Sequence, residues 1–242
     1  KAEYTYKYRT YGHLGHFVCP ACGYERPGTD VTVTKLLSKD ADSSTVVMEA
    51  GGLSRTVRVN LPAVYNIYNA AGSSAALMAF GMDPDRAMQC AENFQCGFGR
   101  MERFDLNGTV IRMILVKNPA GCNQVIEYLN GLNEAYLPVF LLNDNAADSR
   151  DISWIWDADY EKFAAAYQGE VVVSGIRADD MALRLKYAGI PAEKLTVERD
   201  YDALLDRVSH QDKPVFIIPT YTAMLDIRTR LAHRCGSAEF WE

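Results

Sequence analysis

Carboxylates gather in one short stretch of the chain, where Asp144, Asp148 and Asp151 surround a guanidinium, Arg150. The stretch follows an apolar run, residues 137–142, that predicts a buried strand. In open α/β sheets, ligands bind in the crevice beyond the carboxyl ends of the strands. One Asp is enough to cap a helix, and the chain places three here. We therefore predict a functional loop, with a polar helix-capping loop as the alternative.

A second chemical signal is Cys19-Pro20-Ala21-Cys22-Gly23, in which a turn separates two thiols. This spacing is typical of half a zinc ribbon, and Cys19 and Cys22 are the predicted ligands. A tetrahedral site needs four ligands, and no second Cys-x-x-Cys follows. His13 and His16 are one way to complete it, and a Cys pair from outside this chain is the other. A redox role is less favoured, because no thioredoxin-like βαβ pattern surrounds the motif.

Composition limits the classes of function that fit. The chain has 242 residues, 48% hydrophobic and 23% charged, which suits one large or two modest globular domains. Its net charge of −6 argues against a general nucleic-acid or anionic-membrane surface. No run reaches the ~18 apolar residues that a membrane helix needs. Six cysteines, four of them scattered, favour reduced thiols and a cytoplasmic protein.

The first part of the chain predicts short strands followed by helices. An alternating run over residues 4–8 is strand-like, and β-branched runs predict strands over residues 31–34, 44–48 and 56–59. An Ala-rich helix is expected over residues 62–79, with Asn66 and Asn69 on one face. A second helix should start at Pro84 with Asp83 as its N-cap.

From residue 109 onward, apolar strands alternate with amphipathic helices. This order predicts a parallel sheet covered on both faces, in an α/β domain. The expected strands are residues 110–116, 137–142, 171–174, 196–198 and 215–218. The expected helices are residues 123–133, 160–167, 178–187, 201–209 and 222–233. We place a domain boundary near Asp105, giving domains over residues 1–104 and 105–242.

Several strings together resemble the Mur ligase superfamily. Residues 61–71 are similar to the Asn-x-x-Asn-x-x-Ala helix of its ATP-binding domain, and residues 99–102 to the Gly-Arg-x-Glu segment that closes that domain. Residues 116–121 stand where the C-terminal Mur domain begins. The strings that narrow the resemblance to the Mur-ligase-like subunit of lipid II isoglutaminyl synthase are residues 11–23, 144–157 and 219–223.

The resemblance implies an ATP-dependent ligase that amidates the glutamate of the peptidoglycan stem peptide on lipid II. It implies a fold in which residues 1–104 are part of the Mur central domain, including half a zinc ribbon over residues 1–28, and residues 105–242 form the Rossmann-like C-terminal domain. ATP with Mg²⁺ would be held by Asn66, Asn69 and Arg100, and a structural zinc by the cysteines. The family's Gly-Lys-Thr/Ser phosphate loop and first Cys pair are missing here, and the resemblance places both upstream of Lys1. We therefore expect this chain alone to be inactive.

The resemblance also implies a partner, a GatD-type glutamine amidotransferase subunit with a Cys nucleophile and a His base. An Asp of residues 144–151 would complete that dyad across the interface. Asp148 is the predicted catalytic residue, because it lies mid-loop while Asp144 and Asp151 are better placed as turn and cap residues. Asp151 is the reserve candidate. Trp154 and Trp156 suit either an interface or a core. Two alternatives are a Mur-type amino-acid ligase that needs no glutaminase partner, and a docking module that only recruits an amidotransferase.

Overall fold

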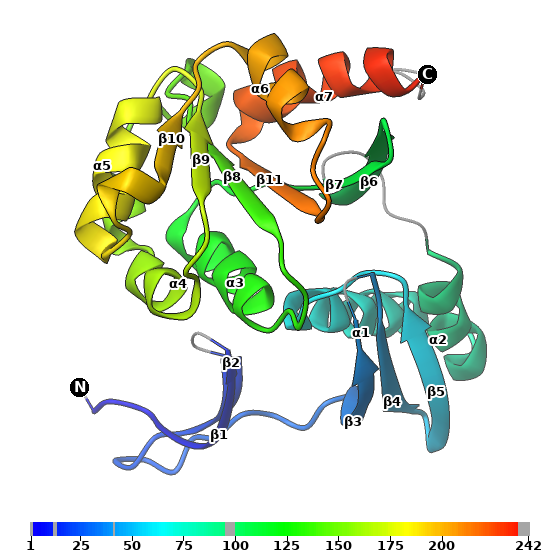
Figure 1. Ribbon diagram of the computed structural model, residues 1–242. Coiled ribbons are helices and arrows are strands. Elements are labelled where there is room, and N and C mark those ends of the chain that lie inside the picture. Colours follow the sequence, from blue (N-terminus) through cyan, green and yellow to red (C-terminus); the bar gives the residue numbers. More distant parts are fainter. Residues whose placement is uncertain (1, 12–13, 41, 95–99, 237–242) are drawn as a thin grey trace.

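The chain folds into three separate β-sheets with helices packed on two of them (Figure 1). The computed structural model describes residues 2–11, 14–40, 42–94 and 100–236, with the side chains of Tyr11 and Arg100 left out of that description. In these ranges no helix is long and apolar enough to cross a membrane.

The N-terminal hairpin pairs β1 (Thr5–Tyr11) with β2 (Leu14–Val18). The strand predicted from the alternating tyrosines is therefore present. Its side chains are mostly exposed, and a small aromatic cluster of Tyr4, Phe17 and Tyr24 is its main packing. A two-stranded ribbon of this kind is marginal by itself.

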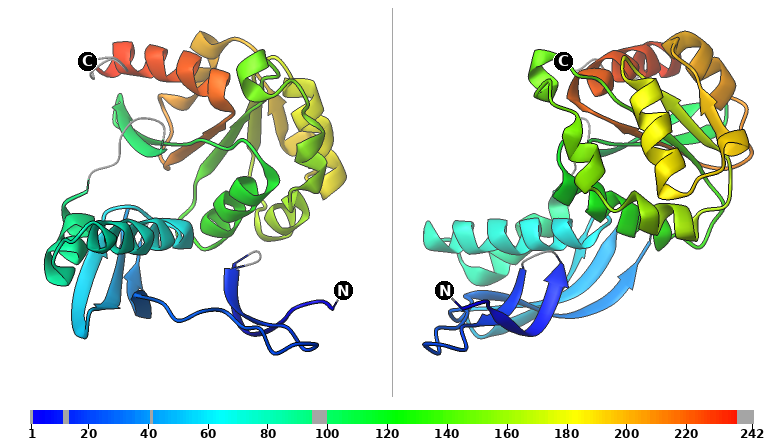
Figure 2. Two further views of the ribbon diagram at one scale, coloured as in Figure 1. Left: turned by 180° about the vertical axis from the view of Figure 1, so that it is seen from behind. Right: turned by 90° about the vertical axis from the view of Figure 1, so that its left-hand side faces the viewer.

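A three-stranded antiparallel sheet follows, in the order β3-β4-β5. Its strands are β3 (Val31–Lys39), β4 (Ser44–Ala50) and β5 (Leu53–Val59). Two helices cover one face, α1 (Val64–Ala79) and α2 (Pro84–Asn93), with Val46, Met48 and Val57 fully buried between the layers (Figure 2). The Asp83 carboxylate accepts the backbone N–H of Arg86, which confirms the predicted N-cap of α2.

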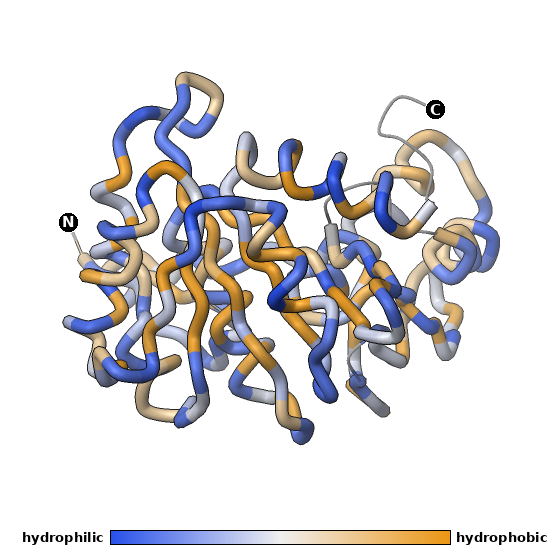
Figure 3. The backbone as a smooth tube through the Cα atoms, turned by 45° about the horizontal axis from the view of Figure 1, so that its top comes forward, coloured by the Kyte–Doolittle hydropathy of each residue, from blue (hydrophilic) through white to orange (hydrophobic). Residues whose placement is uncertain are grey.

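The third sheet has six strands in the order β10-β9-β8-β11-β7-β6, and all neighbours except β6 and β7 run parallel. The strands are β6 (Arg100–Leu106), β7 (Thr109–Ile114), β8 (Leu137–Leu141), β9 (Val171–Ser174), β10 (Leu195–Val197) and β11 (Val215–Pro219). The central strands are buried on both faces, as their continuous apolar runs predicted (Figure 3).

Helices cover both faces of this sheet and bury two separate cores. The face with Phe140, Val173 and Phe216 packs against α3 (Pro119–Asn130), α4 (Tyr160–Ala166) and α5 (Ala178–Ala188). The other face, with Val139, Val172 and Ile217, packs against α6 (Tyr201–Val208) and α7 (Tyr221–Cys235). The predicted parallel α/β domain is confirmed.

The strand order creates a switch point at the middle of the sheet. The chain moves outward from β8 to β9 and β10, and then returns to insert β11 between β7 and β8. After β8 it leads to α4 on one face, whereas after β11 it leads to α7 on the opposite face. Neighbouring strands whose continuations diverge in this way form a topological switch point, and in such sheets ligands usually bind beyond the carboxyl ends of these strands. We call this region the crevice.

Of the predicted boundaries that differ from the structure, two have a clear physical reason. The boundary at residue 105 falls inside β6, which pairs with β7, so the sheet begins at Arg100. Helix α3 begins at Pro119 and not at residue 123, because the Asn118 side chain accepts the N–H of Gly121 and caps the helix there. Asn-Pro therefore starts this helix with a cap and a first-turn proline.

Candidate functional site

The crevice between the carboxyl ends of β8 and β11 holds a buried polar network centred on Asn143, which is 2% exposed. Its backbone N–H donates to Thr220 Oγ1 at 2.9 Å, and its Oδ1 accepts the N–H of Ile176 at 2.9 Å. These bonds tie together the segments that follow β8, β9 and β11. Burial raises the pKa of Tyr201 to about 12, although its hydrogen bond with Asn143 opposes the shift. The network makes the crevice a preorganised scaffold.

Asp148 reaches across this crevice to the first turn of α7. Residues 144–151, which we call the Asp loop, include a short 3₁₀ turn over Ala146–Asp148. Asp148 Oδ1 accepts the N–H of Thr222 at 2.8 Å, and Oδ2 accepts the hydroxyl of the same residue. The usual capping residue, Thr220, makes no side-chain cap, because its hydroxyl is bonded to Asn143. Asp148 thus supplies both the missing cap and a negative charge at the N-terminus of the helix.

The two neighbouring aspartates are differently engaged. Asp144 faces Arg177 at 3.6 Å, and Arg177 also pairs with Asp180 at 3.0 Å. Asp151 Oδ1 accepts the N–H of Ser153 at 2.8 Å, and this bond lowers the pKa of the exposed Asp151 carboxyl. We expected turn and cap roles for Asp144 and Asp151. The structure confirms a turn role for Asp151, while the helix cap falls to Asp148.

The Asp loop ends in a strained turn. Ser149 and Arg150 both have positive φ, 80° and 46°, and neither is glycine. Left-handed backbone costs a non-glycine residue roughly 1–2 kcal/mol, and such strain is often found at functional sites. The turn leaves Asp148 half-exposed at the rim of the crevice.

A buried arginine fixes the segment after the Asp loop. Arg184 of α5 is 2% exposed and donates to the carbonyls of Ile155 and Ala158 at 2.9 and 2.8 Å. It also forms a bidentate pair with Glu161 and lies 5.3 Å from the ring centroid of Trp156. Trp156 is 49% exposed, whereas Trp154 packs against the core. Core packing is therefore confirmed for Trp154, while an interface role for the exposed Trp156 stays a prediction.

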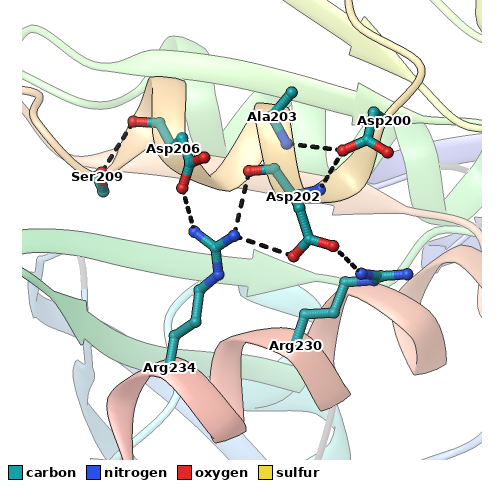
Figure 4. Close-up of polar contacts among 7 residues, drawn as sticks. All are labelled: Asp200, Asp202, Ala203, Asp206, Ser209, Arg230 and Arg234. Carbon is teal, nitrogen blue, oxygen red and sulfur yellow. Dashed lines mark hydrogen bonds and ion pairs between the residues drawn. The ribbon is translucent and has the colours of Figure 1, made fainter.

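Ion pairs hold α7, and with it Thr222, against its neighbours. Arg234 donates to Asp206 at 2.6 Å and to Asp202 at 3.0 Å, and Arg230 pairs with Asp202 (Figure 4). These contacts join α7 to α6. On the other side of α7, the buried guanidinium of Arg228 donates from Nε and Nη2 to the carboxylate of Glu102 in β6, at distances of 2.9 to 3.1 Å. The helix that receives Asp148 is therefore fixed at several points along its length.

The predicted zinc ligands lie on an open turn. Residues 19–23, which we call the Cys turn, close through Gly23 N–H to Cys19 carbonyl at 2.9 Å, with Gly23 at φ 74°. Hydrogen bonds from the backbone of Ala21 and Cys22 lower the pKa of the Cys19 thiol. Such bonds suit a thiolate that binds a metal. Over the described ranges, no three His, Cys, Asp or Glu side chains are grouped to hold a metal ion.

One of the two histidines considered as further ligands is engaged elsewhere. His16 Nε2 lies 3.1 Å from Glu25 Oε2, and its ring packs edge-on against Tyr8. His13 lies outside the described residues. The zinc role of Cys19 and Cys22 therefore stays a prediction.

The predicted nucleotide residues lie on α1 and at the start of β6. Asn66 is 6% exposed in the first turn of α1, where its side-chain N–H donates to the carbonyl of Pro62. Asn69, one turn later, is exposed. Arg100 starts β6 opposite Ile114, and its side chain, like residues 97–99, lies outside the described residues. The structure therefore brings Asn66 and Asn69 onto one helix, and the nucleotide role of all three remains a prediction.

A cavity and an ion pair lie between the three-stranded sheet with its helices and the six-stranded sheet with its helices. The cavity, of about 520 Å³, lies between β3, the start of α1 and α3. Val64 and Ile67 line it, whereas Asn66 and Asn69 lie roughly 200° further round the helix. Arg112 of β7 donates to both carboxylate oxygens of Asp42 at 3.2 Å, joining the six-stranded sheet to the β3–β4 hairpin. The cavity and the predicted adenine contacts are therefore separate features.

Sequence reasoning assigned no role to Thr222 or Asn143, the residues that connect Asp148 to the sheet. Asn143 directly follows one apolar run and Thr222 lies three residues after the end of β11, and these positions were the available signal. Their partners are 74 to 79 residues away in the sequence. The pairing follows from the insertion of β11 beside β8.

Comparison with known proteins agrees with this architecture. Residues 115–224 match the family described as MurT ligase C-terminal. The chain is 35% identical, over 95% of its length, to 51% of the lipid II isoglutaminyl synthase (glutamine-hydrolyzing) subunit MurT of Streptococcus pneumoniae. The MurT subunit of Staphylococcus aureus strain COL is 31% identical over 93% of the chain and 50% of that protein. The chain thus spans about half the length of these curated relatives.

A solved structure shows the same fold over nearly the whole chain. A pseudomurein peptide ligase type C from Methanothermus fervidus matches with a TM-score of 0.65 and 18% identity, covering 96% of this chain and 47% of that one. The chain thus shares the fold of that structure, and four strands of the six-stranded sheet, β8 to β11, lie within residues 115–224. Over residues 115–224, the chain is thus similar to the MurT ligase C-terminal family.

Proposed function

We propose that this chain is part of a glutamine-dependent, ATP-consuming ligase that amidates the glutamate of the peptidoglycan stem peptide on lipid II. Its similarity to MurT subunits over 95% of its length supports the reaction class. The observation that carries the proposal is the position of Asp148, half-exposed at the switch-point crevice of the matched domain. The reaction would take place in the cytoplasm, with the membrane involved only through the lipid-linked substrate.

In this proposal, Asp148 serves a glutaminase active site on a partner subunit of the GatD type. A Cys–His dyad hydrolyses glutamine through a thioester, and the His must hold one tautomer and become an imidazolium during the reaction. A carboxylate that accepts the other imidazole N–H does both. Each oxygen of Asp148 accepts one hydrogen bond from Thr222, and a carboxylate can accept about four hydrogen bonds. Capacity therefore remains for a histidine of the partner.

The ligase half of the reaction would use the predicted nucleotide residues. Bound ATP with Mg²⁺ supplies the phosphoryl group that activates the substrate carboxylate before ammonia attacks it. Asn66 and Asn69 would contact the adenine, and Arg100 would neutralise phosphate charge. We expect Asn66→Ala and Arg100→Ala, in a protein that joins this chain to the phosphate loop, to weaken ATP turnover. Unchanged ATP kinetics in both variants would contradict the nucleotide-binding role of Asn66 and Arg100.

The Cys turn would provide two of the four ligands of a structural zinc. Its backbone N–H groups already favour a thiolate at Cys19, which is the form that binds zinc. The other two ligands would come from outside residues 19–23. Metal analysis of the protein that contains both Cys pairs tests this role, and a metal-free yet folded protein would contradict it.

The decisive experiment compares two ammonia sources in the assembled ligase. Asp148→Asn keeps the size of the side chain and one oxygen that can still cap the N–H of Thr222, but it removes the charge and the acceptor of the Thr222 hydroxyl. We expect it to abolish amidation with glutamine and to leave amidation with added ammonium salt intact. Loss of both activities would indicate a structural role for Asp148, and retention of both would show that it does not serve the glutaminase.

The two alternative functions predict different results for the assembled complex. A Mur-type amino-acid ligase would consume ATP with an amine and need no glutaminase partner. A docking module would bind the amidotransferase, while ATP hydrolysis by the complex would not depend on Asn66 or Arg100.

A further inference from the structure

The surroundings of Asp148 identify a second residue on which the proposed glutaminase step depends. Thr222 contacts three polar side chains at once through a single hydroxyl oxygen. Asn143 Nδ2 lies 3.0 Å from it, Asn145 Nδ2 lies 2.9 Å from it, and Asp148 Oδ2 is its third partner. A hydroxyl has one proton to donate and two lone pairs to accept with, so three partners use all of its capacity.

The direction of each bond follows from the fixed partners. Asn143 is buried, and its Oδ1 accepts the backbone N–H of Ile176, so its amide nitrogen must face Thr222. That nitrogen only donates, as does the amide nitrogen of Asn145. Both lone pairs of the hydroxyl are therefore occupied, and its single proton points to Asp148.

The same threonine also fixes the other oxygen of Asp148. Its backbone N–H, in the first turn of α7, donates to Oδ1 at 2.8 Å. One residue thus holds both carboxylate oxygens, and with them the plane of the carboxyl group. Backbone N–H groups in a helix do not rotate, and the hydroxyl is fixed by the two amides. The remaining lone pairs of Asp148 are therefore aimed in set directions from the rim of the crevice.

We infer that Thr222, oriented by Asn143 and Asn145, is a positioning residue that aims the Asp148 carboxylate at the histidine of the partner glutaminase. This inference rests on the proposed function, because it matters to catalysis only if Asp148 serves that histidine. Thr222 itself touches neither substrate nor the reacting atoms. Its effect is to preorganise the carboxylate, and a misplacement of about 1 Å can cost on the order of 10²-fold in rate.

The test uses three threonine variants in the complete complex with its glutaminase subunit. Thr222→Val removes the hydroxyl but keeps the side-chain shape and the backbone N–H, and Thr222→Ser restores the hydroxyl. Thr229→Val is the matched control, because Thr229 lies on the exposed side of the same helix and donates only to the carbonyl of Leu225 at 2.9 Å. Rates of glutamine hydrolysis, thermal stability and amidation with added ammonium salt are measured for each.

We expect Thr222→Val to lower kcat for glutamine by about 10²-fold, with KM and ammonium-dependent amidation unchanged. Thr222→Ser should return kcat close to that of the unchanged protein, and Thr229→Val should have no effect. A normal kcat in Thr222→Val would overturn the inference, as would an equal loss in Thr222→Ser.

Two further outcomes are distinguishable. If Asp148→Asn is as active as the unchanged protein, the proposed role of Asp148 has failed, whereas an inactive Asp148→Asn beside an active Thr222→Val removes the positioning role alone. If Thr222→Val does not fold, Asn145→Ala decides, because Asn145 is exposed and its loss frees one lone pair of the hydroxyl. A lower kcat in that variant supports the positioning role, and an unchanged kcat overturns it.

Discussion

The Asp loop and the Cys turn contain the two strongest chemical signals in the sequence, and they differ in how much of their surroundings this chain supplies. Around Asp148, segments following three strands meet, and the polar atoms of Asn143, Thr220 and Thr222 are bonded to one another. Around Cys19 there is only a local turn on a mostly exposed hairpin. The contacts that hold the Asp loop join residues more than 70 positions apart in the sequence. The contacts that close the Cys turn join residues at most five positions apart. We therefore expect the loop to depend on the whole fold and the turn to act locally.

The largest effect should come from a glycine beneath the Asp loop. Gly175 has φ 94°, and a Cβ there would lie 2.5 Å from the carbonyl oxygen of Leu142 and 2.8 Å from Asn143 Oδ1. Gly175→Ala must shift β8 or strain the backbone, and we expect a loss of about 2–4 kcal/mol of stability. The midpoint of thermal unfolding should fall by roughly 10 °C.

A glycine with no such neighbours provides the matched control. Gly72 lies within α1, and a Cβ there would meet nothing within 4 Å. Gly72→Ala should raise stability by about 0.5–1 kcal/mol, because alanine favours the helix. If Gly175→Ala is as stable as Gly72→Ala, the Asp loop is not tightly supported by the sheet, and the contrast with the Cys turn is weaker than we describe.

The next effect concerns the segment after the Asp loop. Arg184→Met keeps much of the apolar packing but leaves the carbonyls of Ile155 and Ala158 without their donor. We expect a loss of about 2–3 kcal/mol, because buried carbonyls that lose a partner are costly. Tryptophan fluorescence is the readout, since Trp154 and Trp156 lie in this segment.

An exposed ion pair serves as the control for Arg184. Arg199 and Asp179 are 64% and 72% exposed, and Arg199→Met should cost no more than about 0.5 kcal/mol. Equal losses in the two variants would mean that burial of Arg184 contributes little.

The smallest effect is a difference in thiol reactivity at the Cys turn. The lowered pKa of Cys19 gives it more thiolate near neutral pH, so iodoacetamide should modify Cys19 faster than Cys22. Cys122 should stay unmodified in the folded chain, because it is fully buried and burial raises its pKa to about 12. Mass spectrometry of the alkylated peptides measures all three. Equal alkylation rates at Cys19 and Cys22 would show that the turn does not favour a thiolate at Cys19. In a protein that supplies the further ligands, added zinc should slow the alkylation of both cysteines.

The sequence predicted the fold well wherever the signal was local. Continuous apolar runs identified the parallel strands, and the Asp83-Pro84 pair identified the start of α2. The start of α3 was predicted four residues late, because Asn118-Pro119 was not recognised as a cap followed by a first-turn proline. The position of β11 between β7 and β8 has no local signal, since strand order depends on which helices pack on which face.

The candidate site was predictable only in part for the same reason. Three aspartates after an apolar strand pointed to the Asp loop, but their different engagements depend on remote partners, Thr222 for Asp148 and Arg177 for Asp144. The sequence also favoured Asp144 or Asp151 as the capping residue. Asp148 caps α7 in the structure, whereas the hydroxyl of Thr220, at the usual capping position, accepts the backbone N–H of Asn143.

The central claim is that Asp148, and not its neighbours, provides the carboxylate for the partner's histidine. The most direct measurement is the rate of glutamine hydrolysis by the complete complex with Asp148→Asn, Asp144→Asn or Asp151→Asn. In the serine-protease example of the same Asp-to-Asn change, kcat falls about 10⁴-fold, and we expect a large loss of this kind for Asp148→Asn alone. Full activity in Asp148→Asn, together with loss of activity in either neighbour, would show that a different carboxylate is used, and full activity in all three would show that the Asp loop is structural.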